Sequence, residues 1–241
     1  MTAFDSVKAV LDYDPWTVTG VYAKISENVI SQADDVDLWG VNVGYKFDCY
    51  KAEAETYMFA KINNMVQQFN SKANNDVYTY GIRGSMDPIE CVTLAGEAAW
   101  QWGQYCGDAN SQGNMGRGAW ALDLSAEYRL PENYCWKPKL GTELVMYSGD
   151  RMNDNPDQRR GSYTGWDPMF RGKFDSAIRE FVGTYYATYD YPGRADYLYS
   201  CPDASYTNQT QLIFSGSVMP MDSLTLKANW NRFWTMEKIQ N

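Results

Sequence analysis

Hydrophobic and polar residues alternate with a period of two along much of this chain. In the clearest stretch, Gly118–Leu130, the even-numbered residues from 120 onward are Trp, Leu, Leu, Ala, Tyr and Leu. The odd-numbered residues between them are Ala, Asp, Ser, Glu and Arg. Successive side chains of a β-strand point to opposite faces, so this pattern predicts a strand with one apolar and one water-facing side. The stretches 38–47 and 91–102 alternate in the same way.

The same criterion predicts ten strands along the chain. Most have about ten to thirteen residues, which is long for a globular strand and suits a tilted membrane crossing. The predicted strands are Phe4–Tyr13, Trp16–Ser26, Val36–Phe47, Cys49–Ile62, Val77–Met86, Ile89–Trp102, Gly118–Leu130, Lys137–Ser148, Asn208–Met219 and Ser223–Trp234.

The predicted connections alternate between short and long. Asp14-Pro15, Asp48, Asp87-Pro88, 131–136 and 220–222 are short, whereas 27–35, 63–76, 103–117 and 149–207 are long and polar. Bacterial outer-membrane barrels have short periplasmic turns and long extracellular loops. We therefore predict an all-β, antiparallel transmembrane β-barrel, with residues 1–241 in a single outer-membrane domain and 149–207 as a long extracellular segment.

Composition agrees with this fold class. The chain has no apolar run long enough for a transmembrane helix, and its mean hydropathy is −0.52. In a transmembrane barrel, lumen-facing residues cancel lipid-facing ones in any such average. Aromatic residues make up 15% of the chain, with 19 Tyr and 9 Trp, which suits aromatic belts at two membrane interfaces. A soluble, Tyr-rich, carbohydrate-binding β-sandwich is the alternative.

Several functional classes are disfavoured. The net charge is −9 and no Lys/Arg-rich run exists, which argues against nucleic-acid binding. There is no His, and the five Cys show no CxxC spacing, so neither a zinc site nor thioredoxin-like chemistry is indicated. The pairing of the cysteines is not determined by the sequence. The first residues lack the basic and apolar regions of a signal peptide, which an outer-membrane protein requires.

We assign the charged residues of the strands to the face opposite the apolar one, which is the lumen of a barrel. Nine basic and seven acidic side chains then point inward. So many mixed charges require water or ion pairing, which favours a solvated pore over a dry core. The basic residues are Lys8, Lys24, Lys46, Lys51, Lys61, Arg83, Arg129, Lys139 and Lys227, and the acidic ones are Asp12, Glu53, Glu55, Glu97, Asp123, Glu127 and Glu143.

Basic groups along a wet pore attract an anionic or other hydrophilic solute, and acidic groups between them limit how tightly it is held. We predict that Lys46, Lys51, Arg83, Arg129, Lys139 and Lys227 contact this solute. Glu53, Glu97, Asp123, Glu127 and Glu143 line the same pore. The alternative is that these side chains are cross-strand ion pairs that stiffen the wall.

The sequence contains candidate residues for two other chemistries. Asp150, Asn153, Asp154, Asn155 and Asp157 carry oxygen ligands that suit calcium, but they lack the spacing and central Gly of an EF-hand loop. Glu53 with Glu55, or Asp123 with Glu127, is a candidate carboxylate pair for glycoside hydrolysis. Inward acids occur on many strands without a distinctive pair, so we predict a channel that is not an enzyme and has no cofactor or resident metal.

Two segments resemble the bacterial alginate export family of outer-membrane porins. Leu140–Asp150 reads LGTELVMYSGD, and 165–174, after a polar stretch, reads GWDPMFRGKF. The hairpin formed by 211–220 and 224–233 is also similar to that family, and the resemblance is firmest over residues 137–234.

The resemblance implies a monomeric barrel of about 18 strands, of which about ten lie here, in the outer membrane of a Gram-negative bacterium. It implies that a polyuronate leaves the cell through a basic lumen. It also implies a loop element of Trp166, Asp167, Pro168, Phe170 and Arg171. If this loop folds inward it narrows the pore, and if it lies outside it only decorates the barrel.

Overall fold

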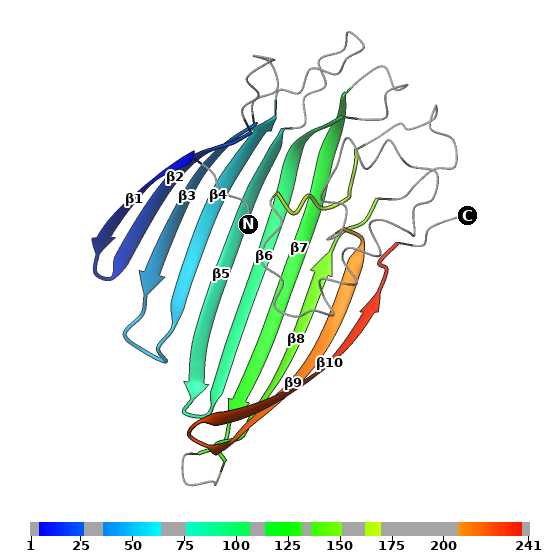
Figure 1. The fold of residues 1–241 in the computed structure, drawn as a ribbon. Coiled ribbons are helices and arrows are strands. Elements are labelled where there is room, and N and C mark those ends of the chain that lie inside the picture. The colour runs from blue at the N-terminus through cyan, green and yellow to red at the C-terminus, as the bar shows by residue number, and fades with distance from the viewer. Residues whose placement is uncertain are drawn as a thin grey trace.

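The computed structural model describes residues 5–26, 36–63, 76–106, 114–131, 136–150, 162–169 and 207–237. They form one antiparallel sheet in which ten strands follow each other in chain order (Figure 1). Nowhere in these residues is there a helix long and apolar enough to cross a bilayer. The strands are β1 (Asp5–Tyr13), β2 (Trp16–Ser26), β3 (Val36–Lys46), β4 (Glu53–Asn63), β5 (Val77–Ile89), β6 (Val92–Cys106), β7 (Asn114–Arg129), β8 (Lys139–Tyr147), β9 (Gln209–Met221) and β10 (Leu224–Trp234).

The sequence prediction of ten antiparallel strands is confirmed, with differences at some strand ends. The strand β4 begins at Glu53 rather than at Cys49, because Tyr50 and Lys51 have positive φ angles and form part of a turn. The strand β7 begins at Asn114, four residues before the predicted Gly118, since it pairs with the upper end of β6.

The prediction of a turn at Asp87-Pro88 is wrong. The strand β5 continues to Ile89, and the turn is formed by Glu90 and Cys91. The ladder between β5 and β6 is irregular between Met86 and Ile89. Proline has no backbone N–H to donate, so it is tolerated where a ladder is interrupted.

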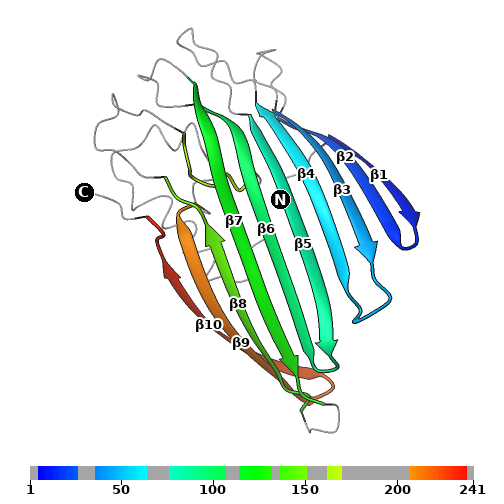
Figure 2. The ribbon, with the colours of Figure 1, turned by 180° about the vertical axis from the view of Figure 1, so that it is seen from behind.

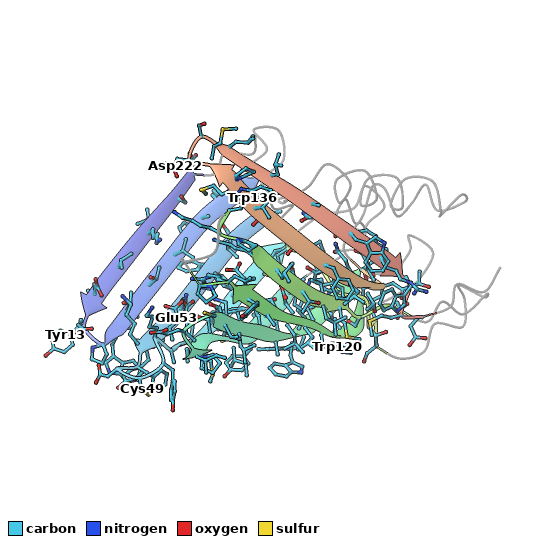
Figure 3. All side chains as sticks on the ribbon, turned by 90° about the horizontal axis from the view of Figure 1, so that it is seen from below. Tyr13, Cys49, Glu53, Trp120, Trp136 and Asp222 are labelled. Atoms are coloured by element: carbon cyan, nitrogen blue, oxygen red, sulfur yellow. The ribbon has the colours of Figure 1, made fainter. Side chains whose placement is uncertain are left out.

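The sheet is strongly curved, and the curve gives it a concave and a convex face. In Figure 1, β9 and β10 come forward of β5–β7, and in Figure 2 the same two strands lie behind. Figure 3 looks from the end that carries the short turns, where Tyr13, Cys49, Trp136 and Asp222 are labelled. The order of pairing runs from β1 to β10 without a pair between these two strands in the described residues, so the sheet is not closed.

The convex face is apolar and open to the surroundings. Val7 and Leu11 on β1 are each 70% exposed, and Leu140 on β8 is 57% exposed. In register across the middle strands, Ile82 lies opposite Ala98, which lies opposite Leu122. Such a face is the reverse of a soluble protein surface, which rarely exposes a large contiguous apolar area. It suits contact with hydrocarbon.

Aromatic residues collect at two levels of the convex face. Near the end with the long connections, Tyr78 lies opposite Trp102 and Tyr80 opposite Trp100, with ring centroids 6.0 and 6.4 Å apart. Near the end with the short turns, Trp16 and Tyr45 form an edge-to-face pair at 4.7 Å. Trp120, at the outer margin of the sheet in Figure 3, belongs to the first group. Two such levels are expected where rings anchor at both membrane interfaces.

The prediction that Lys24 faces the lumen is wrong. It lies directly between Asp5 and Asp37 in the cross-strand register, on the same face as the outward Tyr22. Arg232 on β10 also lies on the convex face, because its cross-strand partner Leu212 lies on that face. All of these charges lie within three residues of a strand end, at the edge with the long connections. Charges are tolerated there because the cost of a charge on the lipid face falls toward the interface.

The two faces of the sheet predict opposite responses to an added charge. Replacing the outward Ile82 by Arg is expected to lower the free energy of unfolding in lipid vesicles by about 2–4 kcal/mol. Replacing Ser85, on the same strand but on the concave face beside Glu53, by Arg is expected to cost much less. Urea titration of both variants measures the difference, and equal losses would contradict contact of the convex face with hydrocarbon.

Candidate functional site

The cross-strand register places ten of the eleven predicted pore-lining residues on the concave face. Through the cross-strand register, each of them is on the same face of the sheet as Arg117 and Lys61. The side chains of Arg117 and Lys61 hold the segment 162–169 on that face. The ten residues are Lys46, Glu53, Arg83, Glu97, Asp123, Glu127, Arg129, Lys139, Glu143 and Lys227. That they contact a solute remains a prediction.

Lys51 differs from the prediction. It lies in the turn between β3 and β4, with its side chain 88% exposed, rather than in a strand. Its ammonium is 3.9 Å from the carboxylate of Asp87, and the carbonyl of Tyr50 accepts a hydrogen bond from the Asp87 N–H at 2.8 Å. Lys51 therefore connects the turn between β3 and β4 to the lower end of β5 at the rim of the sheet.

The middle of the concave face carries a row of facing charges. Glu55, Arg83, Glu97 and Asp123 lie opposite one another on β4, β5, β6 and β7. The Arg83 guanidinium is 2.6 Å from the Glu55 carboxylate, which also accepts a hydrogen bond from Asn42 at 3.0 Å. This row is mainly acidic, and its one base is already paired.

A glycine allows one aromatic side chain to lie across this face. The Tyr57 ring extends from β4 over Gly81 on β5, and its hydroxyl donates a hydrogen bond to Glu97 on β6. A Cβ atom at Gly81 would lie 2.1 Å from the Tyr57 ring. Any larger residue at position 81 would therefore have to displace the ring from its place beside Glu97.

A second row, near the short turns, is basic. Arg129, Lys139, Ser217 and Lys227 lie opposite one another on β7, β8, β9 and β10. Arg129 donates to Glu127 at 2.6 Å and to Thr93 at 2.9 Å. Lys139 and Lys227 are exposed and make no ion pair within the described part of the chain. Arg129 therefore has a counter-charge in Glu127, whereas the two lysines, which lie on either side of Ser217, form an arrangement that attracts an anion.

At the opposite end, residues 162–169 lie along the concave side of the sheet, and we call them the strap. The segment is yellow-green in Figure 1, in front of the middle strands, and lies behind them in Figure 2. The strap begins as an extension of the sheet. The Tyr163 N–H donates to the Gly116 carbonyl at 2.7 Å, and the Gly118 N–H donates to the Tyr163 carbonyl at 2.9 Å.

The unequal lengths of β7 and β8 explain why the strap starts here. The strand β7 has 16 residues and β8 has nine, so the upper part of β7 extends past its neighbour. An unpaired strand edge carries backbone groups that need partners. Tyr163 supplies them in a parallel bridge to Arg117, while Ser148 accepts from the Trp166 N–H at 3.0 Å.

Asp167 anchors the strap to the wall through side chains from three strands. Its carboxylate is 3.3 Å from the ammonium of Lys61 on β4 and 3.6 Å from the guanidinium of Arg117 on β7. Gln101 on β6 donates to the Asp167 carbonyl at 2.6 Å and accepts from its N–H at 2.9 Å. The side chains of Arg117, Asp167 and Lys61 are only 1, 9 and 11% exposed.

Electrostatics keep Asp167 ionised in this buried place. Burial by itself raises the pKa of the carboxyl group, but the charges of Lys61 and Arg117 and the hydrogen bond from the Met169 N–H outweigh it. The pKa of Asp167 therefore lies below its ordinary value. A buried charge of this kind is stable only while its partners are present.

The sequence prediction included part of this cluster. The loop element includes Asp167, and Lys61 is one of the predicted inward bases, whereas the prediction leaves out Gln101 and assigns Arg117 to the connection 103–117. The odd-numbered position of Arg117 continues the inward alternation of β7, and this periodicity is the sequence signal that indicates its face. Trp166 is half-buried with its ring 6.2 Å from that of Tyr147, and Pro168 is also half-buried. Phe170 and Arg171 lie outside the described residues.

The described residues contain only part of the candidate calcium site. Asp150 accepts hydrogen bonds from the Thr164 N–H and hydroxyl at 3.1 and 3.2 Å, and the other predicted calcium ligands, up to Asp157, lie outside the described residues. In the described ranges no group of three or more His, Cys, Asp or Glu side chains is placed to hold a metal ion. Cys49 and Cys91, in two short turns, are free thiols.

Replacing Asp167 by Asn is expected to release the strap, because it leaves Lys61 and Arg117 buried without their shared counter-charge. Breaking a buried ion pair in this way costs about 3–5 kcal/mol. Hydroxyl-radical footprinting of Met169 measures the release as faster oxidation. The matched control, Asp222→Asn, removes an acid from a distant turn and should leave the rate unchanged. Equal rates in the two variants would contradict the anchoring role.

The lowered pKa of Asp167 predicts the pH dependence of docking. A carboxyl whose pKa falls on docking stabilises the docked state above its free value of about 4 and loses this contribution as the pH falls below it. In the native protein, Met169 oxidation should rise as the pH falls from 4 toward 2. In the Asp167→Asn variant it should be high throughout, and a parallel rise in both proteins would point to another group.

Comparison with known proteins gives one family. The family model described as "Alginate export" matches residues 2–241. No curated protein matches the chain. The match spans the whole sheet, the basic row and the strap, and it extends the resemblance seen over 137–234 to the part of the chain where the sequence showed only a similar architecture. The chain belongs to the alginate export family.

Proposed function

We propose that the chain forms the wall of a passive channel through which an anionic polysaccharide of the alginate class crosses the outer membrane. The alginate export family is a family of outer-membrane transport channels rather than of enzymes, which supports this function. The concave face supports it further, since its charged side chains are arranged in rows across the sheet.

The observation that carries the proposal is the basic row of Arg129, Lys139 and Lys227. It lies beside the short turns, which in outer-membrane barrels face the periplasm. Export of a polymer begins at that mouth. Cations there raise the local concentration of an anionic chain, and Arg and Lys both bind carboxylates. The row is thus placed to receive a uronate chain from the periplasm.

The acidic middle row suits the passage of an anionic polymer rather than its tight binding. A polymer that leaves the basic row next meets Glu55, Glu97 and Asp123, among which the single base, Arg83, is already paired with Glu55. Conduction requires sites that bind weakly enough to release. We therefore assign the capture of the polymer to the basic row and its passage to the middle of the wall.

The strap narrows the path at the other end in this proposal. It occupies space on the concave side of β4–β7 and is anchored by Asp167. A narrow, chain-wide passage at this level would let an extended polysaccharide through while limiting the flow of other solutes. Of the two arrangements open for this loop, we adopt the inward one.

The ten strands are part of a larger monomeric barrel of about 18 strands in this proposal, with residues 1–241 in one domain. The edges of β1 and β10 support it. All nine residues of β1 are exposed, and the described residues contain no pair between the two edge strands. A bilayer cannot satisfy unpaired backbone groups, so further strands must cover these edges.

Planar-bilayer conductance of the full-length protein tests the function. An exporter of this class should conduct with anion selectivity, and soluble alginate should block the current while neutral dextran of equal length should not. A pore that conducts but responds equally to both polymers would make it a general porin. Failure to insert would favour the soluble carbohydrate-binding alternative.

Replacing Lys139 and Lys227 together by Gln should weaken alginate block by roughly tenfold, because each lost contact with a carboxylate is worth about 0.5–1 kcal/mol at an exposed site. The control is Lys24→Gln, which removes a lysine from the outward face. If both variants keep the block of the native channel, the basic row is not the capture site.

A further inference from the structure

The convex face has a groove of about 550 Å³ that begins at the aromatic level near the short turns, at Trp16 and Tyr45. Its floor follows one cross-strand row, in which Ala54, Gly84 and Gly96 lie opposite one another on β4, β5 and β6. The same row continues to Tyr45 and Trp16 at one end and to Leu124 at the other. The neighbouring row adds a wall that includes Ile82 and Leu122.

The groove exists because small residues stand where the rest of the face has large ones. Trp16, Ile82 and Leu124 are 48, 45 and 47% exposed, so they stand above the floor. The Leu124 side chain leans toward Gly96, where a Cβ atom would lie 3.1 Å from its terminal carbon. The hollow is therefore bounded by side chains on three sides and by backbone beneath.

Between the Trp16–Tyr45 pair and Leu124, the groove offers mainly hydrocarbon contacts. The outward hydroxyl on this stretch, that of Thr56, donates to the carbonyl of Gly81 at 3.2 Å. Trp16 and Tyr45, which carry an indole N–H and a phenolic hydroxyl, lie at the end of the groove nearest the short turns. The charged side chains beneath it, such as Arg83 and Glu97, have the opposite parity and belong to the concave face. A headgroup, a peptide backbone or a sugar buried along the floor of the groove would lack hydrogen-bond partners there, and each needs hydrogen bonds when it is buried.

We propose that this groove binds one acyl chain of a phospholipid from the periplasmic leaflet. The groove is continuous with the bilayer-facing surface, and it lies on the half of the face nearest the short turns, which face the periplasm. Four strand spacings of about 4.8 Å separate Tyr45 from Leu124, so the groove is about 19 Å long. One hydrocarbon leaflet is about 15 Å thick. The Trp16–Tyr45 pair stands at the end nearest the headgroups, where amphipathic rings favour the interface.

Filling the groove tests this site. Gly96→Leu places a side chain on the floor, and Ala98→Leu, in the neighbouring row, is a second variant that requires no change of glycine. Gly20→Leu is the matched control, because it adds the same side chain to the convex face outside the groove, where nothing lies within 4 Å of the new Cβ atom. All three retain the charged concave face, so alginate block should stay at the native level if the channel function holds.

The measurement is native mass spectrometry of the full-length protein extracted from vesicles of palmitoyl-oleoyl phosphatidylglycerol. We expect one retained phospholipid in the native protein and in Gly20→Leu, and loss of most of that population in Gly96→Leu and Ala98→Leu. Retention in all four proteins, or in none, would overturn the proposal. A dimer of the native chain that both filling variants abolish would overturn it in favour of contact between two copies.

Discussion

The structure depends on one constraint, which is that a wall in hydrocarbon must satisfy its backbone hydrogen bonds within itself. Ten antiparallel strands in chain order meet it across the described sheet, because each inner strand pairs with both neighbours. Once the register is fixed, every side chain is assigned to one face. The apolar set then meets the membrane and the charged set meets water. A slip of one residue between two strands would exchange these faces.

The same register decides which charges meet. Lys227 lies 88 residues after Lys139, but it joins one row with Lys139 and Arg129 because β7 to β10 are aligned at their lower ends. Glu55 and Arg83 pair for the same reason. The two rows have opposite character, so the concave face is basic beside the short turns and mainly acidic in its middle. A net charge of −9 for the whole chain conceals this arrangement.

Small residues have different uses on the two faces. On the concave face Gly81 leaves room for the Tyr57 ring to reach Glu97 across a strand. On the convex face Gly84 and Gly96 leave a hollow that no neighbouring ring fills. The contrast comes from what surrounds each glycine. The strand beside Gly81 supplies the large ring of Tyr57, whereas no ring lies over Gly84 and Gly96, and the space there is left to the bilayer. The strap fills the concave side in a different way, because it is a returning segment that covers the unpaired upper edge of β7.

The sequence by itself determined the ten strands, their order and the face of nearly every charged residue, because a period of two and turn residues such as Pro and Asp are local properties. The sequence prediction placed Lys24 and Lys51 wrongly. The face on which a residue near a strand end lies depends on its pairing with the neighbouring strand and on where the turn begins. The tertiary structure alone decided that Lys61, Gln101 and Arg117 converge on Asp167, which follows them by 106, 66 and 50 residues. Such a cluster results from curvature and from the excess length of β7 over β8, which no local pattern records.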